Sequence, residues 1–399
     1  MIPPGSSGVL PNHYLLRAIE AGVIDVGPSG VEPANIQPAS LDLRLGDVAY
    51  RMRCSFLPGN TDVETRISEL AIDRLDLRED GAVLETNRPY LIPLQERLRL
   101  PAGIRGKANP KSSTGRVDVF TRVITDRSYR FDEIAEGYCG RLYLEVVPLS
   151  FAVRVRQGLT LNQLRLAAGR RELSELSDGE IAELHKIQPL LYVGGRAVPA
   201  SSLTLSGGLF LSLDLRGDED GRIGYRARES APLLDLTEPL PVEPDPFWET
   251  VRREPGGTSR GGSDPKPTPS PPGRVVLTEK KFYLLMSEEA VVIGPGLASE
   301  MTAYDPTSGE LRTHYAGFFD PGFGFDPAGV LLGAKAALEV RAHDVPFMIE
   351  HGQQVCKLTF ERMLEEPTIL YGREPKSNYQ RQTDALGKYF IRGGSPKVT

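Results

Sequence analysis

The sequence lacks the features that mark secreted proteins, membrane-spanning proteins and proteins stabilised by a structural metal ion. Its 399 residues include three scattered cysteines, Cys54, Cys139 and Cys356, so we expect no disulfide framework and no zinc site. No apolar run approaches the roughly 20 residues that a membrane span needs. The first residues, MIPPGSSGVLPNHYLL, lack the basic region and apolar run of a signal peptide. We therefore expect a protein of the reducing cytoplasm with no membrane partner.

An excess of basic residues is also missing. The chain has 47 Lys and Arg against 53 Asp and Glu, a net charge of −6 at pH 7. This balance argues against a nucleic acid as the main partner. It does not exclude a nucleotide, because a local cluster of Arg and Lys matters more for a small anion than the total charge. The histidines His314, His343 and His351 show no metal-ligand spacing, and we interpret them as structural or surface residues.

Proline and glycine, in contrast, are abundant, at 33 and 41 residues. They separate short apolar runs such as residues 90–94 and 291–295, which predicts many short strands joined by tight turns. Residues 13–21 have apolar positions at helical spacing and end at Gly22, as in a short amphipathic helix. Residues 41–45 alternate between leucine and polar neighbours, which predicts a half-buried strand.

Segments of the second half of the chain repeat segments of the first half. Residues 212–216 repeat the SLDLR string of residues 40–44 at an offset of 172. A longer stretch aligns at an offset of 194, so the second half carries a net 22 extra residues (194 − 172). The Pro-, Gly- and Ser-rich segment 252–273 supplies them and is predicted to be a flexible insertion. The aligned positions include Pro101 with Pro295, Asp126 with Asp320, 131–132 with 325–326, 144–146 with 338–340, Gly158 with Gly352, and Leu164 with Leu358.

These patterns predict a mainly β protein made of two tandem domains with a few short helices, as the chain length also favours. We place the first domain at residues 1–170, a helical linker at 171–200 and the second domain at 201–399. The capping-box spacing from Ser177 to Glu180 predicts a helix in the linker. The polar tail that follows Tyr371 is either a plain C-terminal arm or a lid over a ligand.

The turn KSSTGR is the first candidate for function. Short hydroxyl side chains at Ser112 and Ser113 let backbone N–H groups approach a phosphate, and Arg116 can grip two of its oxygens. Lys111 adds a point charge. The same six residues can also form an ordinary turn, and the string alone does not decide between the two.

Two carboxylates in apolar strands are the second candidate. Glu145 and Glu339 occupy equivalent positions of the two repeats. Each could lie on a polar sheet face as an exposed ion pair, worth about 0–1 kcal/mol. Each could instead be a partly buried general acid and base with a raised pKa. Asp126 and Asp320 are candidates for contacting sugar hydroxyls or positioning water, although both also suit turns.

Taken together, these residues resemble the dCTP deaminase family, a branch of the trimeric dUTPase-like β fold. The resemblance covers most of both halves and is greatest to the longer, duplicated members. It is carried by PASLDLRLG at 38–46, SSTGR at 112–116, residues 142–166, FFDPGFG at 318–324, AALEV at 336–340, HGQQVCKLTF at 351–360 and the spacing of Tyr371, Tyr379 and Gln382.

The resemblance implies two dUTPase-like β-barrel or jelly-roll domains and a reaction. Members of the family deaminate the cytosine ring of dCTP to dUTP and ammonia without zinc, and the zinc-deaminase signature is absent here. Glu145 or Glu339 would be the catalytic acid and base. Magnesium would be bound through the triphosphate, not by the protein. The implied substrate-binding residues are Lys111, Ser112, Ser113, Arg116, Asp126, Ala316, Asp320, Tyr371, Tyr379 and Gln382.

The two halves depart from the family pattern in complementary ways. Residues 304–310 carry acids where the first half has its cationic turn, so they would repel a triphosphate. A lysine expected in the tail is replaced by Asn378, with Lys376 close by. Because family sites lie between neighbouring subunits, we expect a composite site that joins Ser112, Ser113 and Arg116 to Glu339 and the tail. A homotrimer or another homo-oligomer would satisfy the threefold packing of the fold.

Two other activities stay open at this stage. The chain could be a dUTP pyrophosphatase, alone or after deamination, because the residues around Asp126 resemble the dUTPase motif for water and sugar. It could also be a nucleotide-binding scaffold without catalysis, because one half has lost its phosphate turn.

Overall fold

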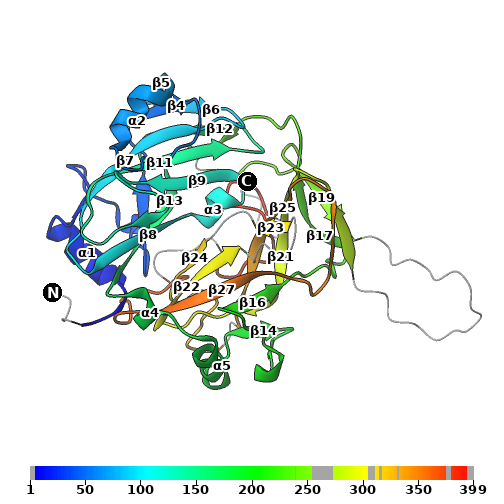
Figure 1. Ribbon diagram of the computed structural model, residues 1–399. Helices are drawn as coiled ribbons and strands as arrows, with labels where there is room; N and C mark the ends of the chain where they lie inside the picture. The colour runs from blue at the N-terminus through cyan, green and yellow to red at the C-terminus, as the bar shows by residue number, and fades with distance from the viewer. Residues whose placement is uncertain are drawn as a thin grey trace, which may run out of the picture.

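The computed structural model describes residues 5–238, 240–253, 273–303, 311–313, 317–329, 332–373 and 379–392 (Figure 1). The chain is mainly β, as predicted. No described helix is long and apolar enough to cross a membrane. The short helices are α1 (Asn12–Glu20), α2 (Val63–Leu70), α3 (Ser112–Gly115), α4 (Arg171–Ser174), α5 (Asp178–Ile187), η1 (Pro33–Asn35) and η2 (Ala200–Ser202).

The first half consists of two larger antiparallel sheets and one small mixed sheet, with leucine and valine side chains between them. One sheet has the order β5 (Ala71–Asp76), β4 (Val48–Met52), β7 (Tyr90–Arg99), β11 (Cys139–Pro148), β9 (Val119–Ile124), with β2 (Ile24–Asp25) on β7. The other has the order β1 (Gly8–Val9), β13 (Thr160–Ala168), β8 (Ile104–Pro110), β10 (Glu133–Ile134), with β3 (Leu41–Arg44) on β13. The small sheet has the order β18 (Leu234–Asp235), β12 (Val153–Val155), β6 (Ala82–Leu84), and its strand β18 comes from the second half of the chain.

The second half repeats this arrangement below the first in Figure 1. Its first sheet has the order β15 (Arg196–Ala197), β14 (Leu191–Val193), β21 (Phe282–Val291), β17 (Arg222–Ala227), β19 (Trp248–Arg252), with β25 (Ala334–Ala342) between β21 and β23 (Leu311–Thr313). Its second has the order β16 (Leu209–Ser212), β27 (Gln354–Arg362), β22 (Leu297–Ala303), β24 (Gly317–Phe319). A ribbon pairs β20 (Arg274–Leu277) with β26 (Phe347–Glu350).

Strand register corrects one of the sequence alignments. Leu41 of β3 pairs with Leu164 of β13, and Leu209 of β16 pairs with Leu358 of β27. Leu164 and Leu358 are 194 residues apart, so Leu209 is the equivalent of Leu41, at an offset of 168 (209 − 41). The predicted offset of 172 was wrong by four residues, and the second half has 26 extra residues (194 − 168). Most of the predicted insertion 252–273 lies outside the described residues.

Hydrogen bonds from the backbone to two glutamates agree with the corrected register. The Arg44 N–H donates to the Glu96 carboxylate at 2.9 Å, and the Ser212 N–H donates to the Glu289 carboxylate at 2.9 Å. Ser212 therefore takes the place of Arg44, and the second SLDLR string begins where the equivalent strand ends. The helix predicted in the linker is confirmed as α5, which begins with a capping box between Ser177 and Glu180.

One apolar cluster joins the first half, part of the second half and the tail, in addition to a separate cluster within the second half. Phe151 of the first half contacts the ring of Trp248 in the second half, with centroids 5.2 Å apart, and Phe390 of the tail contacts Trp248 at 5.8 Å. Ala385 and Leu386 are buried in the same cluster. The C-terminal segment, drawn in red in Figure 1, lies between the halves near α3. The final turn of the described chain therefore packs as part of the core.

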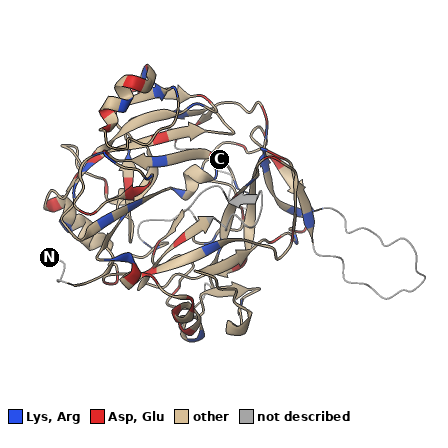
Figure 2. Cartoon of the chain, viewed as in Figure 1, with Lys and Arg blue, Asp and Glu red and all other residues tan. Residues whose placement is uncertain are grey.

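Ion pairs add to this contact between the halves. Lys107 Nζ donates to the Glu300 carboxylate at 2.6 Å, and Arg105 Nη2 donates to Glu361 at 2.6 Å. Figure 2 shows Lys and Arg interspersed with Asp and Glu over both halves. The first-half strand β8 and the second-half strands β22 and β27 carry these paired charges, so their side-chain contacts help to fix how the halves meet.

Truncating Phe390 tests whether the tail belongs to the core. Phe390 is 2% exposed, so Phe390→Ala should lower the free energy of unfolding by about 3–5 kcal/mol, measured by urea denaturation. Its neighbour Ile391 is 37% exposed, and Ile391→Ala is the matched control, expected to cost far less. Equal denaturation midpoints for the two variants would contradict the shared core.

Candidate active site

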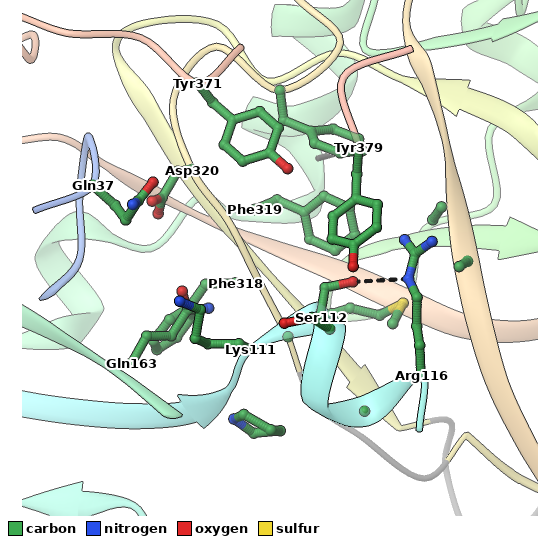
Figure 3. Close-up of a pocket in the computed structure, with 18 of the residues that line it drawn as sticks. Gln37, Lys111, Ser112, Arg116, Gln163, Phe318, Phe319, Asp320, Tyr371 and Tyr379 are labelled. Carbon is green, nitrogen blue, oxygen red and sulfur yellow. Dashed lines mark hydrogen bonds between the residues drawn. The ribbon is translucent and has the colours of Figure 1, made fainter. Parts of the chain in front are cut away.

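A pocket lies where the α3 turn of the first half faces β24, β25 and the tail (Figure 3). It collects nine of the twelve predicted site residues. Glu145 and Asp126 lie elsewhere, and Ala316 lies outside the described residues, as do Lys376, Asn378, His314 and the segment 304–310. The nine are Lys111, Ser112, Ser113, Arg116, Asp320, Glu339, Tyr371, Tyr379 and Gln382.

The predicted turn is a single helical turn, α3, between strands β8 and β9. Thr114 is fully buried and anchors it, because its Oγ1 donates to the Leu161 carbonyl at 2.8 Å. The Arg116 N–H closes the turn onto the Ser112 carbonyl at 3.1 Å. Ser112 and Ser113 both line the pocket. Their position shows why small residues occur here, since the turn packs tightly against β13.

Arg116 is a buried cation in contact with neutral groups. Its Nε donates to Ser112 Oγ at 3.1 Å, and its Nη2 donates to Gln382 Oε1 at 2.6 Å. Its guanidinium lies 3.8 Å from the centroid of the Tyr379 ring (Figure 3). No ion pair joins Arg116 to a carboxylate within the described part of the chain. Burial lowers the pKa of Arg116, so the pocket holds a cation that an anion would stabilise.

Lys111, in contrast, is already paired. Its ammonium donates to the buried Asp42 carboxylate and to Thr160 Oγ1, the latter at 2.9 Å. Burial raises the pKa of Asp42, and Lys111 opposes that rise. Lys111 therefore brings less free charge to the pocket than its place in the sequence implied.

Lys388 is a cation that the sequence reasoning missed. It lines the pocket from the tail, and no carboxylate of the described chain forms an ion pair with it. Partial desolvation and the nearby charge of Lys111 lower the pKa of Lys388. It lies ten residues beyond Asn378, the position where a lysine was expected, so spacing along the sequence gave no signal for it.

Glu339 is the acidic residue of the pocket that lacks an ion pair among the described residues. It lies on β25, opposite Leu284 of β21, and is 4% exposed. Burial raises the pKa of Glu339 to about 7, and the charge of Arg116 opposes this rise. A carboxyl group with this pKa can both take up and release a proton near neutral pH.

Glu145, its repeat equivalent, has a different environment. It pairs across the sheet with Arg122 of β9, whose Nε and Nη2 donate to it at 2.9 and 2.6 Å. Arg122 also lies 3.7 Å from the Phe131 ring centroid. Arg122 thus balances the charge of the Glu145 carboxylate. Glu145 does not line the pocket that contains Glu339.

The two predicted aspartates also differ. Asp320 lies in the pocket wall, where its carboxylate accepts from Arg165 Nη2 at 2.7 Å and from Ser40 Oγ at 3.1 Å. Both donors come from the first half, and neither was a sequence candidate. Asp126 instead accepts from the Val63 N–H at 2.8 Å, at the start of α2. Only Asp320 is therefore placed to contact a ligand in this pocket.

The tail closes one side of the pocket. Gln382 contacts Arg116 through its oxygen and the Lys335 carbonyl through its nitrogen, so it joins the two halves. Tyr371 packs on Phe323, with centroids 5.6 Å apart. Figure 3 shows the rings of Tyr371 and Tyr379 projecting into the same space as Ser112. No cluster of three or more His, Cys, Asp or Glu in the described chain could hold a metal ion.

Comparisons with known proteins agree with this geometry. A family model described as the 2'-deoxycytidine 5'-triphosphate deaminase N-terminal domain matches residues 6–170, and the C-terminal domain model matches residues 177–390. The crystal structure of 2'-deoxycytidine 5'-triphosphate deaminase from Agrobacterium tumefaciens is similar at 40% sequence identity and a TM-score of 0.78, over 91% of this chain and 99% of that chain.

Other comparisons add nothing. Oxalate decarboxylase from Bacillus subtilis aligns at 9% identity and a TM-score of 0.10, over 81% of this chain and 77% of that chain, and carries no argument. A search of curated proteins found no match. The class is nonetheless defined: a duplicated, mainly β member of a deaminase family. The chain belongs to the dCTP deaminase family.

The raised pKa of Glu339 predicts a pH-dependent effect on stability. Because its folded pKa is about 7 and its ordinary value is 4.5, the folded state loses stability as pH rises between these values. Glu339→Gln should remove this loss. At pH 8 the free energy of unfolding of the variant should therefore exceed that of the parent by up to about 3 kcal/mol, and at pH 4 the two values should differ little.

Urea denaturation at pH 4, 6 and 8 measures this difference. Glu145→Gln is the matched control, because it leaves the Arg122 cation unpaired and should lower stability at pH 8. A difference in the free energy of unfolding between Glu339→Gln and the parent that does not change with pH would contradict a raised pKa of Glu339.

Proposed function

We propose that the protein is a dCTP deaminase that hydrolyses dCTP to dUTP and ammonia. The observation that carries the proposal is Glu339, a buried carboxyl with a pKa of about 7, in a pocket that also holds Arg116, a cation with no ion pair among the described residues. The family of the chain and its similarity to the Agrobacterium tumefaciens enzyme support the substrate.

The chemistry needs one group that moves protons in two directions. Ionised Glu339 takes a proton from water while the water oxygen forms a bond to C4 of cytosine. The protonated Glu339 gives that proton to the ring nitrogen N3. It then takes the second proton of the water from the hydroxyl on C4 and passes it to the amine, which leaves as ammonia as the C4–N bond breaks and the C4=O bond forms. A pKa near the working pH suits both steps, since neither protonation state is scarce.

The rest of the pocket would bind and orient the nucleotide. Of the cations that line the pocket, Arg116 and Lys388 form no ion pair with a carboxylate of the described residues, and they suit the triphosphate. The Asp320 carboxylate, which Arg165 and Ser40 hold in position, would contact the sugar of the nucleotide. Magnesium would arrive with the triphosphate as part of the substrate, and we propose a reaction without zinc.

One chain contributes both sides of this pocket. Ser112 and Arg116 come from the first half, and Glu339, Tyr379 and Gln382 come from the second half and the tail. We propose that this composite site is the working one, and that the predicted trimer or other homo-oligomer arranges such sites without having to complete them. The cytoplasmic location stays a prediction.

A second candidate is dUTP hydrolysis to dUMP, alone or after deamination. Asp320 lines the pocket, and a carboxylate there could position water for attack on a phosphate, which favours this activity. Incubating the protein with dCTP and Mg²⁺ and separating dUTP from dUMP distinguishes the two activities. A scaffold without catalysis would yield neither nucleotide and no ammonia.

Substituting the two glutamates separately tests the composite site. Glu339→Gln keeps the shape but cannot accept a proton, so the turnover rate on dCTP should fall by about 10²–10⁴-fold. Glu145→Gln should keep turnover within a few fold of the parent in protein shown to be folded by circular dichroism. Loss of deamination in Glu145→Gln with activity retained in Glu339→Gln would overturn the assignment.

Removing Lys388 tests the anion site. Lys388→Met should raise the KM for dCTP about tenfold or more, the equivalent of one charge-assisted hydrogen bond, with a smaller change in kcat. Lys186→Met on α5, which removes an exposed lysine paired with Glu183, is the control and should leave KM unchanged. An unchanged KM for Lys388→Met would remove Lys388 from the binding site.

A further inference from the structure

Glu339 has a potential cationic partner on its own strand. Arg341 lies two residues further along β25, and alternate residues of a strand project from the same face. The two Cα atoms of such a pair are about 7 Å apart, which a long guanidinium side chain can span. An ion pair between Arg341 and Glu339 would neutralise the carboxylate and favour its ionised form.

Arg341 is instead paired with a residue of the first half. Its Nη2 donates to the carboxylate of Asp118, and its Nη1 donates to the Lys280 carbonyl. The Asp118 side chain is fully buried and also accepts from Ser150 Oγ at 2.5 Å. Asp118 follows Arg116 by two residues. The turn that places Arg116 in the pocket therefore leads directly to the carboxylate that binds Arg341.

The backbone at Asp118 agrees with a specialised role. Its φ is +56°, in the left-handed region that aspartate and asparagine tolerate better than most residues. Its N–H donates to the Gly115 carbonyl at 2.9 Å, and its own carbonyl accepts from the Leu149 N–H at 2.9 Å. The carboxylate is thereby fixed in position before any ligand binds.

The first half shows the alternative arrangement. Two residues beyond Glu145 the chain has Val147, which offers no cation. Arg122 of the neighbouring strand pairs with Glu145 directly. One repeat therefore has its glutamate neutralised, whereas in the other the nearest cation on the strand is held by a different carboxylate.

We propose that Asp118 is a positioning residue for the acid–base group of this pocket. It holds Arg341 away from Glu339, so that the Glu339 carboxylate has no cationic partner on its own strand. The inference deepens the proposed function and rests on it for its catalytic meaning. In addition, the negative charge of Asp118 contributes to the raised pKa of Glu339, after burial.

Other charges around Glu339 are accounted for. Arg116 acts on it in the opposite sense to Asp118. The titratable and charged side chains of the described elements around the pocket include Lys111, Arg116 and Asp118 near α3, Asp42 on β3, Arg165 on β13, Asp320 after β24, Glu289 on β21, Lys335 and Arg341 on β25, Cys356 on β27, and Tyr371, Tyr379 and Lys388 in the tail.

Direct titration of Glu339 tests the proposal without turnover. The carboxyl carbon of Glu339 can be followed by NMR in protein labelled with ¹³C-glutamate, and assigned by its absence in Glu339→Gln. Asp118→Asn removes a negative charge and frees Arg341, so the midpoint should fall by about one pH unit or more. Arg341→Gln leaves Asp118 unneutralised, so the midpoint should rise by a similar amount.

Two further variants separate this effect from a general loss of structure. The double variant Asp118→Asn with Arg341→Gln removes both charges and should return the midpoint close to the parent value. Glu361→Gln breaks another ion pair between the halves, that with Arg105, and should not move the midpoint. Shifts of the same sign in both single variants, or no shift in either, would overturn the proposal. If one single variant does not fold, the midpoints of the other single variant and of the double variant still test the proposal.

The acid limb of the pH–rate profile for dCTP gives the second readout. It should move with the NMR midpoint in each variant, because Glu339 must be ionised to accept the proton. Midpoints that shift as expected in a protein that releases no ammonia would retain the positioning of Glu339 and reject dCTP deamination. Deamination by the parent with unmoved midpoints would reject the role of Asp118 alone.

Discussion

The pocket depends on a buried guanidinium that forms no ion pair with a carboxylate of the described residues. Arg116 is held by a serine hydroxyl, a glutamine side chain, two backbone carbonyls and the face of Tyr379. Neutral acceptors keep such a cation in place but leave most of its charge uncompensated. Because those acceptors come from both the first half and the tail, the site exists only when the tail is packed in the shared core.

The same principle separates the two glutamates. Glu145 and Glu339 occupy equivalent strands, yet their chemistry is set by which cation reaches them. Arg122 neutralises the first, while the cation nearest the second along its strand is bound elsewhere. Desolvation without compensation is what shifts a carboxyl pKa towards neutrality. The duplicated fold therefore provides two copies of a glutamate in two different electrostatic environments.

Much of the fold and part of the candidate site could be predicted from the sequence, because strands that fill a core keep their apolar spacing. The offset of 194 came from residue types alone, whereas the expectation that an α3 residue such as Ser112 shares a site with Glu339 also needed the family resemblance. The register of β16 did not, because a shift of four residues preserves the alternation of faces, and only the partner strand distinguishes Leu209 from Leu213. The Arg165–Asp320 pair joins residues 155 apart, and no local pattern encodes such a contact.

A site whose two walls lie on a single polypeptide has an evolutionary consequence. In a ring of identical subunits, every substitution is copied onto both sides of each interface, so a change that helps one wall is imposed on the other. Here Val147 and Arg341 occupy equivalent strand positions and have already diverged. Duplication thus lets the wall that carries Glu339 and the wall that carries Arg116 change independently of one another.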